Sequence, residues 1–306
     1  MRTRELGRTG LRVSELGLGC SRLGGGVFYR DDRAALRLLH AAFDGGITFY
    51  DTADTYGYGR SEVFLGRAFR GMRRRIVLAS KVGNLPTSLA RFGRWLAPIA
   101  GPFRPGLQRW REPLKAASHR RQDFSPRHLQ HAIHGTLRRL RTDYVDLYQL
   151  HSPPRAVLER GEVFATLERI QRAGKIRWYG VSVATLEDAI TCQAHSGLAS
   201  IQAPFSVLEP EAAHRLIPLL HDRRIGLIAR VPFGRGRVLS GVETPQGRRA
   251  TIAGALRFIL QHPEVSTVIP GTSRVEHLEE LLEAVRSLEA ADLGIRPALA
   301  PSRLHA

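Results

Sequence analysis

Four ionisable side chains follow short apolar segments in the first half of the sequence, and their types suit proton transfer. Asp51 and Tyr56 belong to the run Asp-Thr-Ala-Asp-Thr-Tyr-Gly, Lys81 stands near the end of an apolar run, and His151 ends another. The set contains no nucleophile–base pair and no cluster of metal ligands. It therefore indicates acid–base chemistry without a bound metal.

A tyrosine next to a lysine can act as a general acid. A free tyrosine side chain has a pKa near ~10 and exchanges protons poorly at neutral pH, but a nearby ammonium group favours the phenolate. Asp51 can pair with Lys81 and keep it charged. A neutral His151 can donate a hydrogen bond to a carbonyl oxygen and orient it. Such a set can protonate the oxyanion that forms when hydride reaches a carbonyl carbon.

Each of these residues also has a simpler explanation when it is considered alone. Asp51 could cap a turn, and Tyr56 could be a half-buried aromatic residue. Lys81 could mark the point where a strand reaches water, and His151 could be a loop histidine with satisfied hydrogen bonds. Their occurrence at the ends of three successive apolar segments favours the catalytic interpretation.

Short apolar segments alternate with longer amphipathic segments along the whole chain, which predicts strands and helices in alternation. Several of the short segments are continuously apolar, as expected for parallel strands covered on both faces. The expected strands span residues 16–20, 48–52, 76–82, 145–150, 179–182, 200–204, 226–231 and 266–270. The expected helices span residues 31–44, 125–140, 162–173, 185–195, 211–223, 250–261 and 275–288.

This alternation predicts an α/β protein, a (β/α)₈ TIM barrel formed by a single domain over residues 1–306. Right-handed crossovers between parallel strands favour a closed barrel, and a doubly wound open sheet is the alternative. In a barrel, active sites lie at the C-terminal ends of the strands. The four ionisable residues would then meet at that end.

One long connection interrupts the pattern between the third strand and the third helix. Residues 84–124 are rich in proline and arginine, and Glu112 and Asp123 are their only acidic residues. A loop of this length inside a barrel is either functional or partly disordered. It could be a lid that favours anionic or aromatic carbonyl substrates. The interpretation we prefer is a surface excursion or a contact with another subunit.

Composition restricts the class of protein. The formal net charge is +18, and almost all of the basic residues are arginine. The arginines are dispersed along the chain without a basic tail or an aromatic platform, so we expect no nucleic-acid partner.

The two cysteines, Cys20 and Cys192, are far apart and are expected to be free thiols. No apolar run suits a signal peptide or a membrane span, so we expect a cytoplasmic protein without a membrane partner.

The motifs together resemble the aldo-keto reductase family in type and in order. The resemblance extends from residue 4 to residue 279, except for 84–124. The motifs are Asp-Thr-Ala-Asp-Thr-Tyr-Gly at 51–57, Ser-Lys-Val at 80–82, Asp-Leu-Tyr-Gln-Leu-His at 146–151 and Gly-Val-Ser at 180–182. The resemblance implies a (β/α)₈ barrel that reduces small aldehydes or ketones with NADPH. It places the catalytic tetrad on Asp51, Tyr56, Lys81 and His151.

The resemblance also implies residues that bind the nicotinamide half of the cofactor. Ser182 and Gln202 match the positions that contact the carboxamide, whereas Val183 stands where the family has asparagine. Arg230 matches the position that stacks on the nicotinamide, and a planar guanidinium can also stack. The next loop would cover the pyrophosphate, although its arginines could equally be solvated surface charge. The loop residues concerned are Val231, Phe233, Arg235 and Arg237.

The start of the last helix resembles the family's pocket for the adenosine 2′-phosphate, because a helix N-terminus attracts anions. Gly271 and His277 replace the lysine and arginine of some members, and Leu281 replaces the asparagine that follows Glu280. These departures leave NAD possible, although NADP is the expected cofactor. The residues expected to bind the phosphate and adenine are Gly271, Thr272, Ser273, Arg274, His277 and Glu280.

Two other classes of function are compatible with parts of the sequence. One is a cofactor-binding barrel of the same family with a regulatory or partner-binding role. The complete tetrad argues against it. The other is a non-redox barrel isomerase that uses Lys81 and His151 differently, and the Gly-Val-Ser motif with Gln202 argues against that. The residues do not identify the substrate or the oligomeric state.

Overall fold

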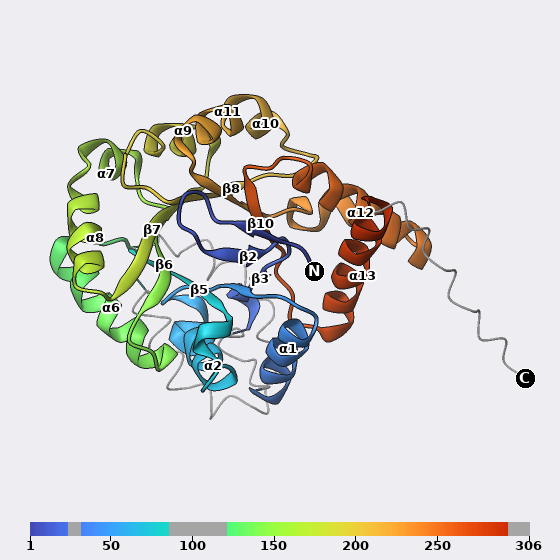
Figure 1. Cartoon of the computed structure of the whole chain (residues 1–306), viewed down its shortest axis with the longest axis horizontal. Coiled ribbons are helices and arrows are strands. Elements are labelled where there is room, and N and C mark those ends of the chain that lie inside the picture. The colour runs from blue at the N-terminus through green and yellow to red at the C-terminus, as the bar shows by residue number, and fades with distance from the viewer. Residues whose placement is uncertain (24–31, 86–120, 293–306) are drawn as a thin grey trace, which may run out of the picture.

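A computed structural model describes residues 1–23, 32–85 and 121–292 of the chain. Within these ranges, eight parallel strands pair in the order β10-β9-β8-β7-β6-β5-β4-β3. Parallel bridges from Leu16 to Val268 and from Gly19 to Gly271 join the two ends of this sheet. The sheet is therefore closed (Figure 1), which confirms the predicted (β/α)₈ barrel over the doubly wound alternative.

The strands lie where the apolar segments predict them, because each is buried between the barrel interior and the surrounding helices. All positions of β5 and β6 are buried. The bounds are β3 (Leu18–Gly19), β4 (Phe49–Asp51), β5 (Val77–Val82), β6 (Val145–His151), β7 (Ile176–Ser182), β8 (Ser200–Pro204), β9 (Gly226–Arg230) and β10 (Val265–Ile269).

Helices surround the sheet (Figure 1), and their buried apolar residues belong to the same core as those of the strands. Ser125 caps α6 by accepting a hydrogen bond from the backbone N–H of His128, as the Ser-Pro pair predicts. The helices are α1 (Asp32–Asp44), α2 (Arg60–Ala68), α6 (Pro126–Leu140), α7 (Arg155–Arg160), α8 (Glu162–Arg172), α9 (Leu186–Cys192), α10 (Glu211–Arg215), α11 (Ile217–Arg223), α12 (Pro245–Leu260) and α13 (Val275–Asp292).

Two expectations about helices were wrong, and two helices were missed. Residues 211–223 form two helices, α10 and α11, because Pro218 has no N–H to continue the first helix and stands in the first turn of the second. Helix α12 starts at Pro245 instead of residue 250, since Thr244 caps it by accepting a hydrogen bond from Gly247. Helices α2 and α7 were not expected.

An N-terminal hairpin, also not expected, closes the end of the barrel opposite the C-terminal strand ends. It consists of β1 (Thr3–Glu5) paired antiparallel with β2 (Arg12–Ser14). Leu6 and Val13 are fully buried and pack against Phe49, where β4 begins. The hairpin therefore plugs the bottom of the barrel with apolar side chains.

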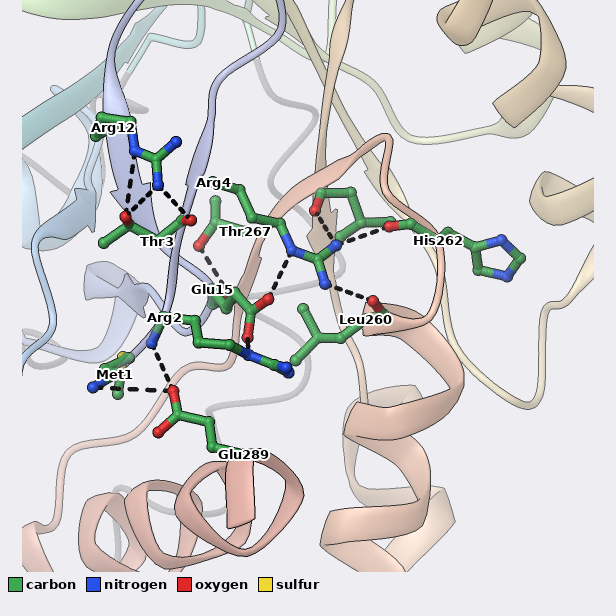
Figure 2. Close-up of polar contacts among 11 residues, drawn as sticks. Met1, Arg2, Thr3, Arg4, Arg12, Glu15, Leu260, His262, Thr267 and Glu289 are labelled. Atoms are coloured by element: carbon green, nitrogen blue, oxygen red, sulfur yellow. Dashed lines mark hydrogen bonds and ion pairs between the residues drawn. The ribbon is translucent and has the colours of Figure 1, made fainter. Parts of the chain in front are cut away.

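Arg4 ties this hairpin to the last part of the chain (Figure 2). Its Nε donates to Glu15 Oε1 at 2.7 Å, and its Nη2 donates to the carbonyl oxygen of Leu260 at 2.6 Å. Its Nη1 donates to the carbonyl oxygens of His262 and Val265 at 2.8 and 2.9 Å. One guanidinium thus satisfies backbone carbonyl groups from the end of α12 to the start of β10.

Most of the long connection 84–124 lies outside the described residues. At its two described ends, the Gln122 amide donates to the Asn84 side-chain oxygen at 2.9 Å. None of the helices described in the structure is long and apolar enough to cross a membrane.

Candidate active site

The four ionisable residues come together at the C-terminal ends of the strands, as predicted. Asp51 ends β4, Lys81 is the penultimate residue of β5, and His151 ends β6. Tyr56 begins the short 3-10 helix η2 (Tyr56–Gly59) that follows β4. Register fixes this arrangement, since β4, β5 and β6 are neighbouring parallel strands whose ends meet at one rim.

Lys81 is the centre of the group. Its Nζ lies 2.5 Å from Asp51 Oδ2, 2.9 Å from the carbonyl oxygen of Thr52 and 3.2 Å from the Tyr56 hydroxyl. The Lys81 side chain has no solvent exposure. Burial lowers the pKa of Lys81, but attraction to Asp51 and hydrogen bonds to Asp51 and Tyr56 outweigh it, so its pKa is raised. The lysine therefore stays an ammonium group beside the tyrosine hydroxyl.

A left-handed turn follows Tyr56, whose hydroxyl contacts this ammonium group. Gly57, Tyr58 and Gly59 all have positive φ, at 55°, 57° and 84°. Glycine adopts this conformation readily, whereas Tyr58 does so at a cost. The ring of Tyr56 meets the ring of His151 edge-on, with centroids 5.7 Å apart and an interplanar angle of 86°. Tyr56 is thus in contact with both Lys81 and His151.

The second carboxylate oxygen of Asp51 is held by two amides. Gln202 Nε2 donates to Asp51 Oδ1 at 2.8 Å, and Gln149 Nε2 donates to the same oxygen at 3.3 Å. Ser182 Oγ in turn donates to Gln202 Oε1 at 2.8 Å. Sequence reasoning missed Gln149, although the alternation of side chains along β6 places it on the same face as His151.

A cavity of about 470 Å³ opens beside these residues and reaches the N-terminal end of α13. Asp51 and Tyr56 line one part of it. Of the residues expected to bind cofactor, the structure places the following in its wall: Gln202, Arg230, Val231, Phe233, Arg235, Gly271, Thr272, His277 and Glu280.

Four of the residues expected to bind cofactor do not line this cavity. Ser182 is buried and bonded to Gln202, while Arg237, Ser273 and Arg274 are exposed and absent from the lining. The Thr272 hydroxyl accepts from the backbone N–H of Arg274 at 3.1 Å and lies 3.2 Å from its carbonyl oxygen. Thr272 therefore holds the backbone of this turn, and the exposed Arg274 is not part of the cavity wall.

The loop after β9 is held in a strained conformation where it borders the cavity. Val231 has a φ of 57°, which is unfavourable for a β-branched residue, and Arg235 has a φ of 60°. Such a conformation costs roughly 1–3 kcal/mol and persists only where neighbouring contacts impose it. Next to Val231, Arg230 donates from Nε and Nη2 to the carbonyl oxygen of Val183, at 3.2 and 2.6 Å.

Several lining residues had no signal in the sequence. Arg22 comes from the 3-10 helix η1 (Cys20–Arg22), and Arg248 comes from α12. Arg248 Nε lies 3.0 Å from both carboxylate oxygens of Glu280 on α13. Neither arginine belongs to a motif, so only the packing of distant elements brings them to the cavity.

The expectation of free thiols is confirmed, because both cysteines are buried and unbridged. Burial raises the pKa of the Cys192 thiol to about 12. Burial, followed by the charge of Asp51, also raises the pKa of the Cys20 thiol. Within residues 1–23, 32–85 and 121–292, no group of three or more His, Cys, Asp or Glu side chains could hold a metal ion.

Comparison with known proteins gives consistent matches. Residues 15–250 match the sequence model of the aldo/keto reductase family. The chain is 30% identical to the uncharacterized oxidoreductase YqkF of Bacillus subtilis (strain 168), over 94% of this chain and 92% of that protein. It is 29% identical to the pyridoxal 4-dehydrogenase of Microbacterium luteolum, over 90% and 91%. It is similar to the holo form of aldo-keto reductase AKR11C1 from Bacillus halodurans, with a TM-score of 0.73, 26% identity and full coverage of both chains.

Proposed function

The chain belongs to the aldo/keto reductase family of oxidoreductases, and from this premise we propose that it reduces an aldehyde or ketone to an alcohol with NADPH and with Tyr56 as the proton donor. The observation that carries this proposal is the contact of Lys81 Nζ with both Asp51 and the Tyr56 hydroxyl, at 2.5 and 3.2 Å. A buried ammonium group beside a phenol is the arrangement that proton transfer to an oxyanion requires.

The lining of the cavity suits a nicotinamide dinucleotide. Its wall contains Arg22, Arg230, Arg235 and Arg248, which can compensate the charge of phosphate groups. The amide of Gln202 lies at the end of the cavity where Asp51 and Tyr56 are found. When bound, this cofactor supplies the hydride that reduces the carbonyl carbon.

The residues of the chain perform the proton half of the reaction. As negative charge develops on the carbonyl oxygen, the Tyr56 hydroxyl gives its proton to that oxygen, and an alcohol forms. The phenolate left behind is stabilised by the Lys81 ammonium group, and solvent returns a proton to it. His151, whose ring meets Tyr56 edge-on, positions the carbonyl oxygen. In the reverse direction the phenolate accepts the proton of an alcohol.

The Asp51–Lys81 pair keeps this chemistry available. Asp51 holds Lys81 charged, and the amides of Gln202 and Gln149 fix the orientation of the carboxylate. Lys81 therefore cannot rotate away from Tyr56 without breaking a buried ion pair. The supporting residues are positioning residues, since they act through Lys81.

The test is oxidation of NADPH by the purified protein in the presence of a panel of aldehydes, ketones and sugars, with pyridoxal included because one relative bears its name. We expect loss of NADPH absorbance with at least one carbonyl compound and formation of the matching alcohol. If NADPH binds but no member of a broad panel is reduced, and no alcohol is oxidised with NADP⁺, the proposal fails.

A further inference from the structure

Arg248 and Glu280 form an ion pair in the cavity wall, away from Tyr56. Arg248 lies near the start of α12 and Glu280 in the second turn of α13, and these two helices pack side by side. The side chains are 31% and 29% exposed, and both line the cavity. They border it together with Gly271, Thr272 and His277, at the start of α13.

The guanidinium of Arg248 keeps most of its donors available. An arginine side chain has five N–H donors. Within the described ranges only its Nε–H is engaged, and the two oxygens of Glu280 share this donor at 3.0 Å each. Among the residues described in the structure, neither terminal amino group of Arg248 has a hydrogen-bond partner. Arg248 can therefore bind an anion without leaving Glu280.

The other groups at this end of the cavity are weaker anion ligands. The Thr272 hydroxyl is engaged by the backbone of Arg274, and the Arg274 side chain lies outside the lining. Of the four arginines that line the cavity, Arg248 is the one that bonds a residue of α13 in the described part of the chain. Because the nicotinamide has to lie beside Tyr56 for reduction, the adenosine half of the cofactor extends toward these residues.

We propose that the Arg248–Glu280 pair selects between the two nicotinamide cofactors, with Arg248 binding the 2′-phosphate of NADPH and Glu280 accepting a hydrogen bond from the 2′-hydroxyl of NADH. A carboxylate accepts from a ribose hydroxyl and repels a phosphate, whereas a guanidinium binds a phosphate. The proposal rests on the proposed function and adds the residues that set its cofactor preference. The protein then uses both cofactors and prefers NADPH.

Two substitutions distinguish the contribution of Arg248 to cofactor binding from that of Glu280. Arg248→Gln is expected to weaken NADPH binding by about tenfold or more and to change NADH binding by less than about threefold, because charge-assisted bonds to the phosphate are lost. Glu280→Gln is expected to strengthen NADPH binding and weaken NADH binding. The two variants therefore move the ratio of the dissociation constants in opposite directions.

The adjacent arginine provides a matched control. Arg249 pairs with Glu283 at 3.0 Å, but both side chains are more than half exposed and neither lines the cavity. Arg249→Gln changes the net charge of the protein by the same amount as Arg248→Gln. It is expected to leave both dissociation constants unchanged, and Arg248→Lys is expected to recover part of the affinity for NADPH.

The experiment is calorimetric titration of the full chain and its variants with NADPH, NADH, adenosine 2′,5′-bisphosphate and 5′-AMP, with circular dichroism as a check of folding. Loss of affinity for NADPH and the bisphosphate in Arg248→Gln, with NADH and AMP unaffected, supports selection by the pair. An unchanged ratio in folded Arg248→Gln and Glu280→Gln overturns it while leaving the proposed function intact. A wild-type protein that binds neither dinucleotide overturns both.

Discussion

Lys81 Nζ lies 2.5 Å from Asp51 Oδ2, and both side chains are buried inside the rim of the barrel. Two opposite charges in this position are tolerated because each satisfies the other and because amides and a backbone carbonyl satisfy the remaining groups. The Asp51–Lys81 contact therefore contributes both to the stability of the fold and to the proposed proton transfer.

Removal of the lysine is expected to destabilise the fold as well as abolish turnover. Lys81→Met leaves Asp51 as a buried charge without a counter-ion, which costs about 3–5 kcal/mol in the free energy of unfolding. Urea denaturation measures this loss. The double variant Lys81→Met with Asp51→Asn is expected to recover most of the stability and none of the turnover. A single variant as stable as the wild type would contradict the pairing.

Replacement of the proposed proton donor is expected to separate turnover from binding. Tyr56→Phe removes only the hydroxyl oxygen, so kcat is expected to fall by ~10²-fold or more while NADPH still binds. Steady-state kinetics and a fluorescence titration with NADPH measure the two effects. Tyr58→Phe is the control, because Tyr58 is in the same turn but does not line the cavity. Near-normal kcat in Tyr56→Phe would remove Tyr56 from the mechanism.

The second aspartate of the Asp-Thr-Ala-Asp motif is expected to make stability depend on pH. Burial, followed by the charge of Glu62, raises the pKa of Asp54 from 3.8 to about 8. Its Oδ1 is shielded from solvent and has no hydrogen-bond partner in the described part of the chain. As pH rises from about 4 to about 8, the unfolded chain releases a proton that the folded protein retains. The folded state therefore loses up to ~1.4 kcal/mol per pH unit.

Asp54→Asn removes this titration, so the variant is expected to gain stability relative to the wild type as pH rises from about 5 to about 8, with no further gain above about 8. Chemical denaturation of both proteins across this range gives the difference directly. Parallel stability curves for the two proteins would mean that Asp54 titrates normally.

The arginine that ties the hairpin is expected to affect stability without affecting catalysis. Arg4→Met removes four hydrogen bonds and leaves the buried Glu15 with Arg2 as its remaining ion-pair partner, so the free energy of unfolding is expected to fall by about 2–5 kcal/mol. Values of kcat and KM below the melting temperature should stay the same, since the hairpin lies at the opposite end of the barrel. The control is Arg12→Met, because Arg12 is exposed and bonds Thr3. Equal losses in the two variants would contradict the role of Arg4.

The strand ends could be predicted from the sequence because local patterns determine them. Continuous apolar runs set each strand, and parallel pairing brings their last residues to one rim, so Asp51, Lys81 and His151 had to meet. The alternation alone also permitted a doubly wound open sheet, and it is the bridges from Leu16 to Val268 and from Gly19 to Gly271 that show a closed barrel. Pro218 also predicts a break between two helices, and the expectation of a single helix over residues 211–223 did not take it into account.

Other parts of the site depend on contacts between segments that are far apart in the chain. Arg248 reaches the cavity only because α12 packs against α13, and no local pattern distinguishes it from Arg249. Likewise, the Thr272 hydroxyl is engaged by the backbone of its own turn, and Arg274 does not line the cavity. Tertiary packing determines which of these side chains line the cavity, and the periodicity of the sequence does not show it.

The position of the N-terminal hairpin has a consequence for how the chain folds during synthesis. Arg4 and its partner Leu260 are separated by 256 positions, and the bridges that complete the sheet join Leu16 and Gly19 to Val268 and Gly271. At about 5–20 residues per second, a ribosome needs on the order of 10 to 50 s to deliver these partners after the hairpin has been made. During that interval β3 has an open edge, which is a site for aggregation. Closure of the barrel therefore cannot take place before residues 268–271 have been synthesised.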